Sequence, residues 1–187
     1  MGNALNYIHE SQEKNTNTNH HDLIIKFAKN PDDKNSHYYD RNAVNDVIKY
    51  IYRGAKKLPP NHQIFGAVGV GAAGVDGAIE DFYKVKSVYK KENYLQLKHI
   101  IISMQKKPNL PTRKIRKKVI KTAMFFSPEY QVYYGVHYDE ERQCNFHIHL
   151  AINSVNCLNG KQINLKSKMF QRFKKKANRI WSDYQNP

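Results

Sequence analysis

Residues 145–153, which read Asn-Phe-His-Ile-His-Leu-Ala-Ile-Asn, constrain the fold more than any other part of the chain. Apolar side chains occupy every second position, and alternate side chains of a β-strand point to opposite faces of the sheet. One face of this strand can therefore pack on helices. It consists of Phe146, Ile148, Leu150 and Ile152. The other face carries His147 and His149, whose backbones are about 7 Å apart in an extended chain.

A third histidine, His137, lies in the preceding predicted strand, residues 130–138. A hairpin centred on Arg142 pairs His137 with His147, and one centred on Gln143 pairs it with His149. Both registers place the three imidazoles on one face, with directly opposed Cβ atoms about 4.5–5.5 Å apart. Three imidazoles that leave room for a substrate are typical of an open, catalytic metal site, although an accidental cluster is the alternative.

The rest of the chain predicts a single α+β domain, with a central antiparallel sheet and helices packed on it. Residues 1–22 are polar and predict a flexible N-terminal extension, so the domain is expected to span residues 23–187. Further strands are predicted at residues 23–27, 64–71 and 94–104. Helices are predicted at residues 42–54, 75–91, 112–126 and 166–184.

The charge of the chain indicates a polyanionic partner. Thirty-one Lys and Arg against 16 Asp and Glu give a net charge of +15, which favours nucleic acid. The outer faces of the helices at 112–126 and 166–184 are strongly basic and are natural phosphate contacts. No apolar run is long enough for a membrane helix, so no membrane insertion is expected. Cys144 and Cys157 form no disulfide framework, which favours a reducing cytoplasm.

Three segments together resemble a known family. They are His137-Tyr138-Asp139, Asn145-Phe146-His147-Ile148-His149 and Ile152-Asn153-Ser154-Val155-Asn156. They resemble the third motif of conjugative and mobilisation relaxases, HUH endonucleases of the MOBP class, in which an H-x-D…H-x-H…N pattern binds metal. Residues 97–103 resemble the central strand of that family, and residues 44–57 are similar to the helix that carries its tyrosine nucleophile.

The resemblance, which covers roughly residues 23–185, implies a role for each site residue. His137, His147 and His149 are the implied metal ligands, and Tyr50 is the implied nucleophile. Asp139 is either an orienting or basic residue of the site or an ordinary acid of the turn.

Two features depart from the family pattern. His137 lies ten residues before His147 instead of the usual seven, so the hairpin needs a bulge or a looser loop. Tyr52 lies in the same helical turn as Tyr50. At 100° per residue the two tyrosines flank the apolar stripe on opposite sides, so only one can face the metal. The resemblance favours Tyr50.

The implied function is strand-specific DNA nicking at the origin of transfer of a mobile element, through a covalent 5′-phosphotyrosine. The implied cofactor is a divalent metal, Mn²⁺ or Mg²⁺; imidazole ligands also suit Zn²⁺, Co²⁺ and Ni²⁺, and Mn²⁺ is expected to serve better than Mg²⁺. The implied partners are single-stranded and hairpin DNA, with accessory relaxosome or coupling proteins.

Three other interpretations of the function remain open. A rolling-circle replication initiator of the HUH class would carry its tyrosine downstream of the histidines, for example Tyr184. A non-catalytic DNA-binding protein would need no metal. A metal-dependent RNase or phosphoesterase without a covalent step would cleave without Tyr50.

Overall fold

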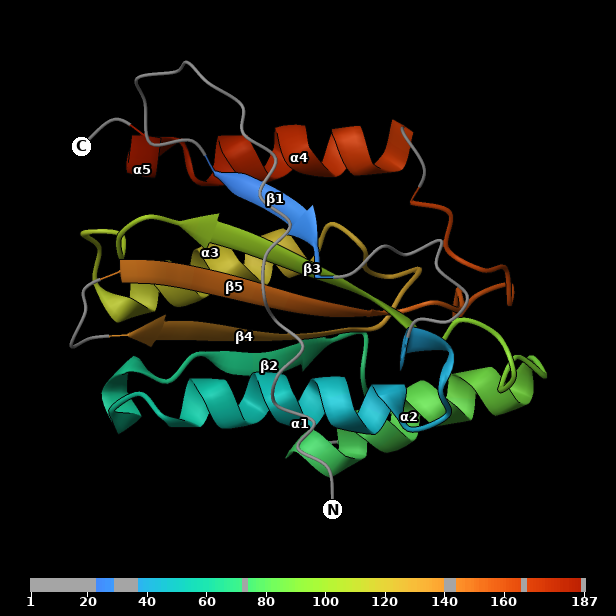
Figure 1. Ribbon diagram of the computed structural model, residues 1–187. Helices are drawn as coiled ribbons and strands as arrows, with labels where there is room; N and C mark the ends of the chain where they lie inside the picture. Colours follow the sequence, from blue (N-terminus) through green and yellow to red (C-terminus); the bar gives the residue numbers. More distant parts are fainter. Residues whose placement is uncertain (1–22, 29–36, 72–73, 140–143, 166–167, 186–187) are drawn as a thin grey trace.

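A five-stranded antiparallel sheet forms the centre of the molecule, with the strand order β1-β3-β5-β4-β2 (Figure 1). The computed structural model describes residues 23–28, 37–71, 74–139, 144–165 and 168–185. Its strands are β1 (Ile24–Phe27), β2 (Phe65–Val68), β3 (Leu97–Met104), β4 (Val132–Asp139) and β5 (Cys144–Asn153). The expected α+β class is confirmed. The expected extension at residues 1–22 lies outside the described residues.

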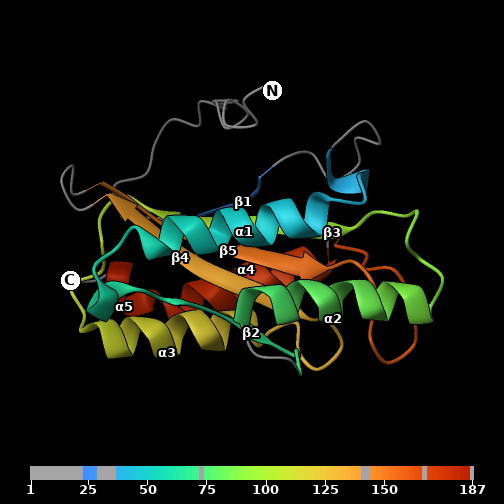
Figure 2. The same ribbon diagram turned by 90° about the horizontal axis from the view of Figure 1, so that it is seen from below.

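Helices cover both faces of the sheet (Figure 2). α1 (Ala43–Lys56) and α2 (Gly74–Val88) lie on one face, which we call the histidine face. The opposite face, which we call the back face, is covered by α3 (Thr112–Ala123), α4 (Lys168–Ile180) and the short α5 (Ser182–Gln185). Short 3₁₀ turns occur at His37–Tyr39 and Pro60–His62.

The last predicted helix, residues 166–184, is divided in two by Trp181. The Trp181 side chain is fully buried, and its indole N–H donates to Thr122 Oγ1 of α3 at 3.1 Å. The apolar period of the sequence continues through this point, so the interruption was not predictable from it. The buried bond to Thr122 coincides with the turn.

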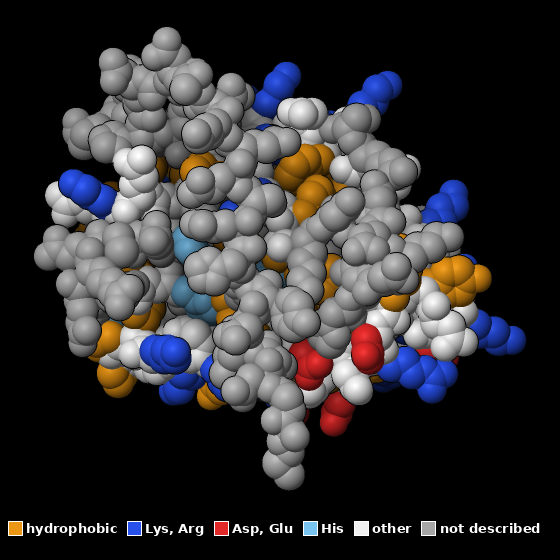
Figure 3. Space-filling model, in the orientation of Figure 1, with side chains coloured by type: hydrophobic (Ala, Val, Ile, Leu, Met, Phe, Trp, Pro, Cys, Tyr) orange, Lys and Arg blue, Asp and Glu red, His pale blue; other side chains and the backbone are white. Residues whose placement is uncertain are grey.

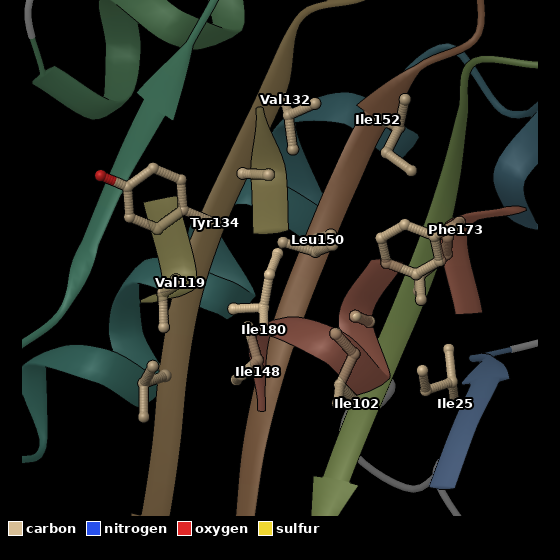
Figure 4. Close-up of a cluster of buried hydrophobic side chains, with 14 of the residues drawn as sticks. Ile25, Ile102, Val119, Val132, Tyr134, Ile148, Leu150, Ile152, Phe173 and Ile180 are labelled. Atoms are coloured by element: carbon tan, nitrogen blue, oxygen red, sulfur yellow. The ribbon is translucent and has the colours of Figure 1, made fainter. Parts of the chain in front are cut away.

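The main core lies between the sheet and the back-face helices (Figure 4). The alternation in residues 145–153 has the predicted result, because Ile148, Leu150 and Ile152 all point into this core. There they pack with Val119 of α3 and Phe173 of α4. Burial of each large apolar side chain in this core stabilises the folded state by about 1.5–3 kcal/mol.

On the histidine face, α1 approaches β4 very closely because Gly135 has no side chain. A Cβ atom at Gly135 would lie 2.5 Å from Cγ2 of Ile51, which is too close for any other residue without movement. A smaller core of α1, α2, Tyr133 and Ala151 fills the space beside this contact. The strand β1 at the far edge is more open, and its Ile24 is 57% exposed.

The register of β4 and β5 fixes where the histidines meet. The pairs run from Val132 with Ile152 to His137 with His147, which is the register of a hairpin centred on Arg142. The register then shifts, so that Asp139 pairs with Cys144. The irregularity expected from the ten-residue spacing is therefore present, and it comes after His137.

Candidate active site

Four histidines gather on the histidine face of the three central strands. His137 comes from β4, His147 and His149 from β5, and His99 from β3. The ring centroid of His149 lies 4.1 Å from that of His137, 5.2 Å from that of His99 and 6.0 Å from that of His147. Histidine side chains are visible from this side of the molecule between the surrounding residues (Figure 3). The three predicted ligands are thus close together, and His99 joins them.

His99 was not among the predicted site residues. The alternation of side chains along the strands could have identified His99. It pairs with Ala151 of β5, which lies two residues from His149, so His99 and His149 share a face of the sheet. That pairing was not evident from the sequence, since β3 and β5 are far apart along the chain.

The ring of His137 packs against the last turns of α1. Its Nε2 donates to the carbonyl oxygen of Ile51 at 3.0 Å. A Cβ atom at Gly54 would lie only 2.1 Å from the same nitrogen, so a glycine at this point of α1 makes room for the imidazole. Gly54 is therefore a determinant of the His137 position that motif reading missed.

Replacing Gly54 by alanine is expected to displace His137. In a helix interior this change normally stabilises by about 1 kcal/mol, but the clash should cost about 1–3 kcal/mol. We expect a lower thermal stability together with weaker metal binding, measured by a thermal melt and by titration calorimetry. Gly71→Ala is the matched control, because its Cβ would meet only Asp81 Oδ2 at an ordinary 3.6 Å. A Gly54→Ala variant that binds metal as tightly as the wild type would contradict the role of Gly54 in positioning His137.

A chain of hydrogen bonds leads from Tyr38 to the cluster. The Tyr38 hydroxyl and His99 Nδ1 are 3.1 Å apart, and His99 Nε2 and His149 Nδ1 are 3.0 Å apart. The remaining nitrogen, His149 Nε2, is buried and forms no hydrogen bond. If His149 Nδ1–H donates to His99 and His99 Nδ1–H donates to Tyr38, that nitrogen presents a lone pair.

The imidazoles are held neutral by their surroundings. Burial lowers the pKa of His99 to about 3 and, against the bond to Ile51, that of His137 to about 4. Burial and the neighbouring histidines lower the pKa of His149 well below its usual value. The pKa of His147 is lowered by burial and by the charge of Lys26. At neutral pH all four rings therefore keep a lone pair, which metal coordination requires.

The four imidazole rings lie close together, but their nitrogen atoms do not converge on one point. Among the described residues, no three His, Cys, Asp or Glu side chains are placed to hold a metal ion. The expected convergence is not met because His137 directs Nε2 to the Ile51 carbonyl. The donor chemistry nevertheless fits a transition metal, since the rings are neutral and the buried His149 Nε2 has no partner.

Tyr50 of α1 lies directly over the histidines. Its ring centroid is 5.2 Å from that of His137, 5.6 Å from that of His149 and 6.4 Å from that of His99. Burial raises the pKa of the Tyr50 phenol, so it is protonated at neutral pH. The opposite flank of the helix carries Tyr52, whose ring packs on Phe65 of β2 at 5.0 Å. The structure therefore brings Tyr50, and not Tyr52, to the histidines.

The other candidates lie elsewhere. Tyr184 of α5 packs against the back-face core, and its hydroxyl accepts from the Lys106 N–H at 3.3 Å. The side chain of Asp139 lies outside the described residues, so its expected role is not placed. Lys49, the residue before Tyr50, forms an ion pair with Asp76 of α2 at 3.7 Å.

Comparison with known proteins shows the family to which the chain belongs. A model of the family described as "Relaxase: MobA/VirD2-like, nuclease domain" matches residues 50–185. The chain belongs to this relaxase family. The relaxase is therefore a nuclease domain of the kind that acts in DNA mobilisation, as the resemblance implied. The matched region includes Tyr50, His99 and the three predicted ligands.

One similar solved structure is described as "Molecular Basis of Vancomycin Resistance Transfer in Staphylococcus aureus". Its sequence is 14% identical to that of the relaxase. The alignment covers 87% of this chain and 93% of the other chain, with a TM-score of 0.46. No match was found among curated proteins. In the part of the relaxase that the structure describes, no helix is long and apolar enough to cross a membrane.

Proposed function

We propose that the relaxase nicks one DNA strand at the origin of transfer of a mobile element, with Tyr50 as the nucleophile. The observation that carries the proposal is the position of the Tyr50 ring over His137, His149 and His99. A phenol and several neutral imidazoles on the same face form the side-chain set that such chemistry requires. The back face offers no comparable set among the described residues.

The proposed step is a transesterification. The Tyr50 hydroxyl oxygen attacks the scissile phosphorus, and the bond from phosphorus to the 3′ oxygen breaks. The products are a 5′-phosphotyrosine and a free 3′-hydroxyl, with the phenol proton lost and one proton gained by the leaving oxygen. One phosphodiester is exchanged for another, so the reverse attack by the 3′-hydroxyl rejoins the strand without a nucleotide cofactor.

The Tyr50 phenol must lose its proton to act as a nucleophile, and burial keeps it protonated at neutral pH. A divalent cation held by His147, His149 and His137 would neutralise charge on the scissile phosphate and favour the phenolate. The buried His149 Nε2 has no partner and is available for this role, whereas His137 would coordinate through Nδ1 or give up its bond to Ile51. Mn²⁺ is the proposed cation, with Mg²⁺, Zn²⁺, Co²⁺ and Ni²⁺ as alternatives.

Tyr38 and His99 are proposed to position His149 for that cation. Tyr38→Phe removes only the hydroxyl at the end of the chain of hydrogen bonds, so His99 can adopt the other tautomer. We expect Mn²⁺ affinity to fall about 10-fold, and up to about 100-fold in His99→Gln, by titration calorimetry. Tyr39→Phe, in the same 3₁₀ turn, is the matched control. Equal affinities in Tyr38→Phe and Tyr39→Phe would leave Tyr38 with no positioning role.

The proposed substrate is single-stranded DNA with an adjoining hairpin, which would reach the histidines from the side of β1. Lys26 on that strand is exposed and close enough to His147 to affect its pKa, so it can contact the approaching phosphates. The proposal also includes a domain of residues 23–187, a cytoplasmic location, and accessory relaxosome or coupling proteins.

The test is a covalent adduct. Supercoiled DNA of the element that carries the gene is incubated with the relaxase and Mn²⁺, and the reaction is stopped with detergent. We expect nicked DNA with protein bound at the 5′ end, and neither product in excess EDTA. Tight DNA binding with no nick on this cognate DNA would overturn the enzymatic proposal, and a nick without an adduct would overturn the covalent step.

A further inference from the structure

The back-face helices carry an unusual concentration of positive charge. α3 and α4 together contain twelve Lys and Arg and no Asp or Glu. Nine of these twelve side chains are exposed. One of the nine, Arg116, bonds to another part of the chain, and we call the other eight the back-face cations. They are Arg113, Lys114, Lys117 and Lys121 of α3, with Lys168, Arg172, Lys175 and Arg179 of α4.

The back-face cations have no anionic partner within the described part of the chain. Three of the other four cations of these helices interact with other residues of this chain. Lys118 bonds to Asp183 at 2.9 Å, Arg116 donates to the Gln63 carbonyl at 2.8 Å, and Lys174 lies over the Phe170 ring. Lys176 is the fourth, and it is half-buried. Eight uncompensated charges on one surface repel one another, and an anionic ligand would relieve that repulsion.

Hydrogen bonds join α3 to the C-terminal end of α4 and to the residue that follows it, so the back-face cations have a fixed arrangement. Lys118 of α3 donates to the Ile180 carbonyl at the end of α4, and Trp181 donates to Thr122. Each helix shows its cations on the side away from its buried residues, such as Val119 and Phe173. The row on α4 runs over about 16 Å and that on α3 over about 12 Å, at a rise of 1.5 Å per residue.

This surface is separated from the nicking site. The histidines lie on one face of the sheet and the two helices cover the other (Figure 2). The sheet and the full diameter of a helix, about 10–12 Å, therefore stand between the back-face cations and Tyr50. The phosphate attacked by Tyr50 and its immediate neighbours cannot reach these side chains.

We infer that the back-face cations bind duplex DNA, as a second DNA site that is separate from the strand-transfer site. Axes of packed helices are about 8–10 Å apart, so the surface presents two neighbouring rows of cations. A duplex offers two backbones to such an arrangement, whereas a single strand offers one row of phosphates. Contacts of Lys and Arg with phosphates carry no sequence information, so we expect this binding to be independent of sequence.

The test uses a fluorescently labelled 24-base-pair duplex of unrelated sequence, without metal. A quadruple variant, Lys117→Gln, Lys121→Gln, Lys175→Gln and Arg179→Gln, is compared with a control that loses the same charge elsewhere. The control is Lys56→Gln, Lys84→Gln, Lys90→Gln and Lys161→Gln. Affinity is measured by anisotropy between 50 and 200 mM salt. We expect the slope of log affinity against log salt to fall by about 3–4 in the back-face variant and by less than about 1 in the control.

Other results would overturn the inference. Equal losses in both variants would show a response to net charge alone. Loss of single-strand binding with duplex binding unchanged would assign the surface to the scissile strand. Wild-type duplex binding should also survive saturation with unlabelled single strand. Since no nick is measured, this test and the adduct test can fail independently.

Discussion

Replacing Tyr50 by phenylalanine is expected to abolish the covalent adduct and to lower the nicking rate by at least about a thousandfold. The substitution removes only the hydroxyl that would attack the phosphate. The ring would keep its contacts with His137 and His149, so folding and DNA binding should be close to those of the wild type. Adduct on a denaturing gel and the rate of plasmid nicking give the two measurements.

Tyr52→Phe is the matched control, because Tyr52 lies two residues along the same helix and packs on Phe65. We expect it to form adduct at a rate near that of the wild type. If Tyr50→Phe still forms adduct and Tyr184→Phe does not, the rolling-circle arrangement is correct and Tyr50 is not the nucleophile. That outcome would require Tyr184 to leave the back-face core against which it packs.

Removal of the His149 imidazole is the second change with a large expected effect. His149 is the central member of the cluster, since its ring lies near those of His137, His99 and His147. His149→Ala deletes the buried nitrogen that has no partner in the protein. We expect Mn²⁺ affinity to fall at least about 100-fold, because loss of an orienting neighbour alone costs 10- to 100-fold in metal sites.

Thermal stability gives a readout that needs no DNA. At Mn²⁺ about 100-fold above its Kd, the wild type should gain about 2.7 kcal/mol, and His149→Ala should lose most of this gain. His62→Ala removes a histidine of a 3₁₀ turn outside the cluster and should keep the full gain. A normal Mn²⁺-dependent gain in His149→Ala would remove this residue from the set of metal ligands.

The strand pattern of residues 145–153 was sufficient to predict which residues face the core. The reason is that side chains of a strand alternate with a period of two, so burial of one face also assigns the other. Helix geometry likewise separated Tyr50 from Tyr52, because residues two apart point in widely different directions. The sequence determined these local facts, together with the α+β class and the basic character of the helices at 112–126 and 166–184.

Contacts between distant segments were decided only by the tertiary structure. The pairing of β3 with β5 brings His99 to His149, and the 3₁₀ turn brings Tyr38 to His99. Gly54 makes room for a histidine 83 residues away on β4, a relation that no local period contains. The basic helices were expected to contact phosphates, but only the layers of the fold show that they lie opposite the histidines. Periodicity specifies which side of an element is buried, whereas the partner that covers that side depends on how the whole chain packs.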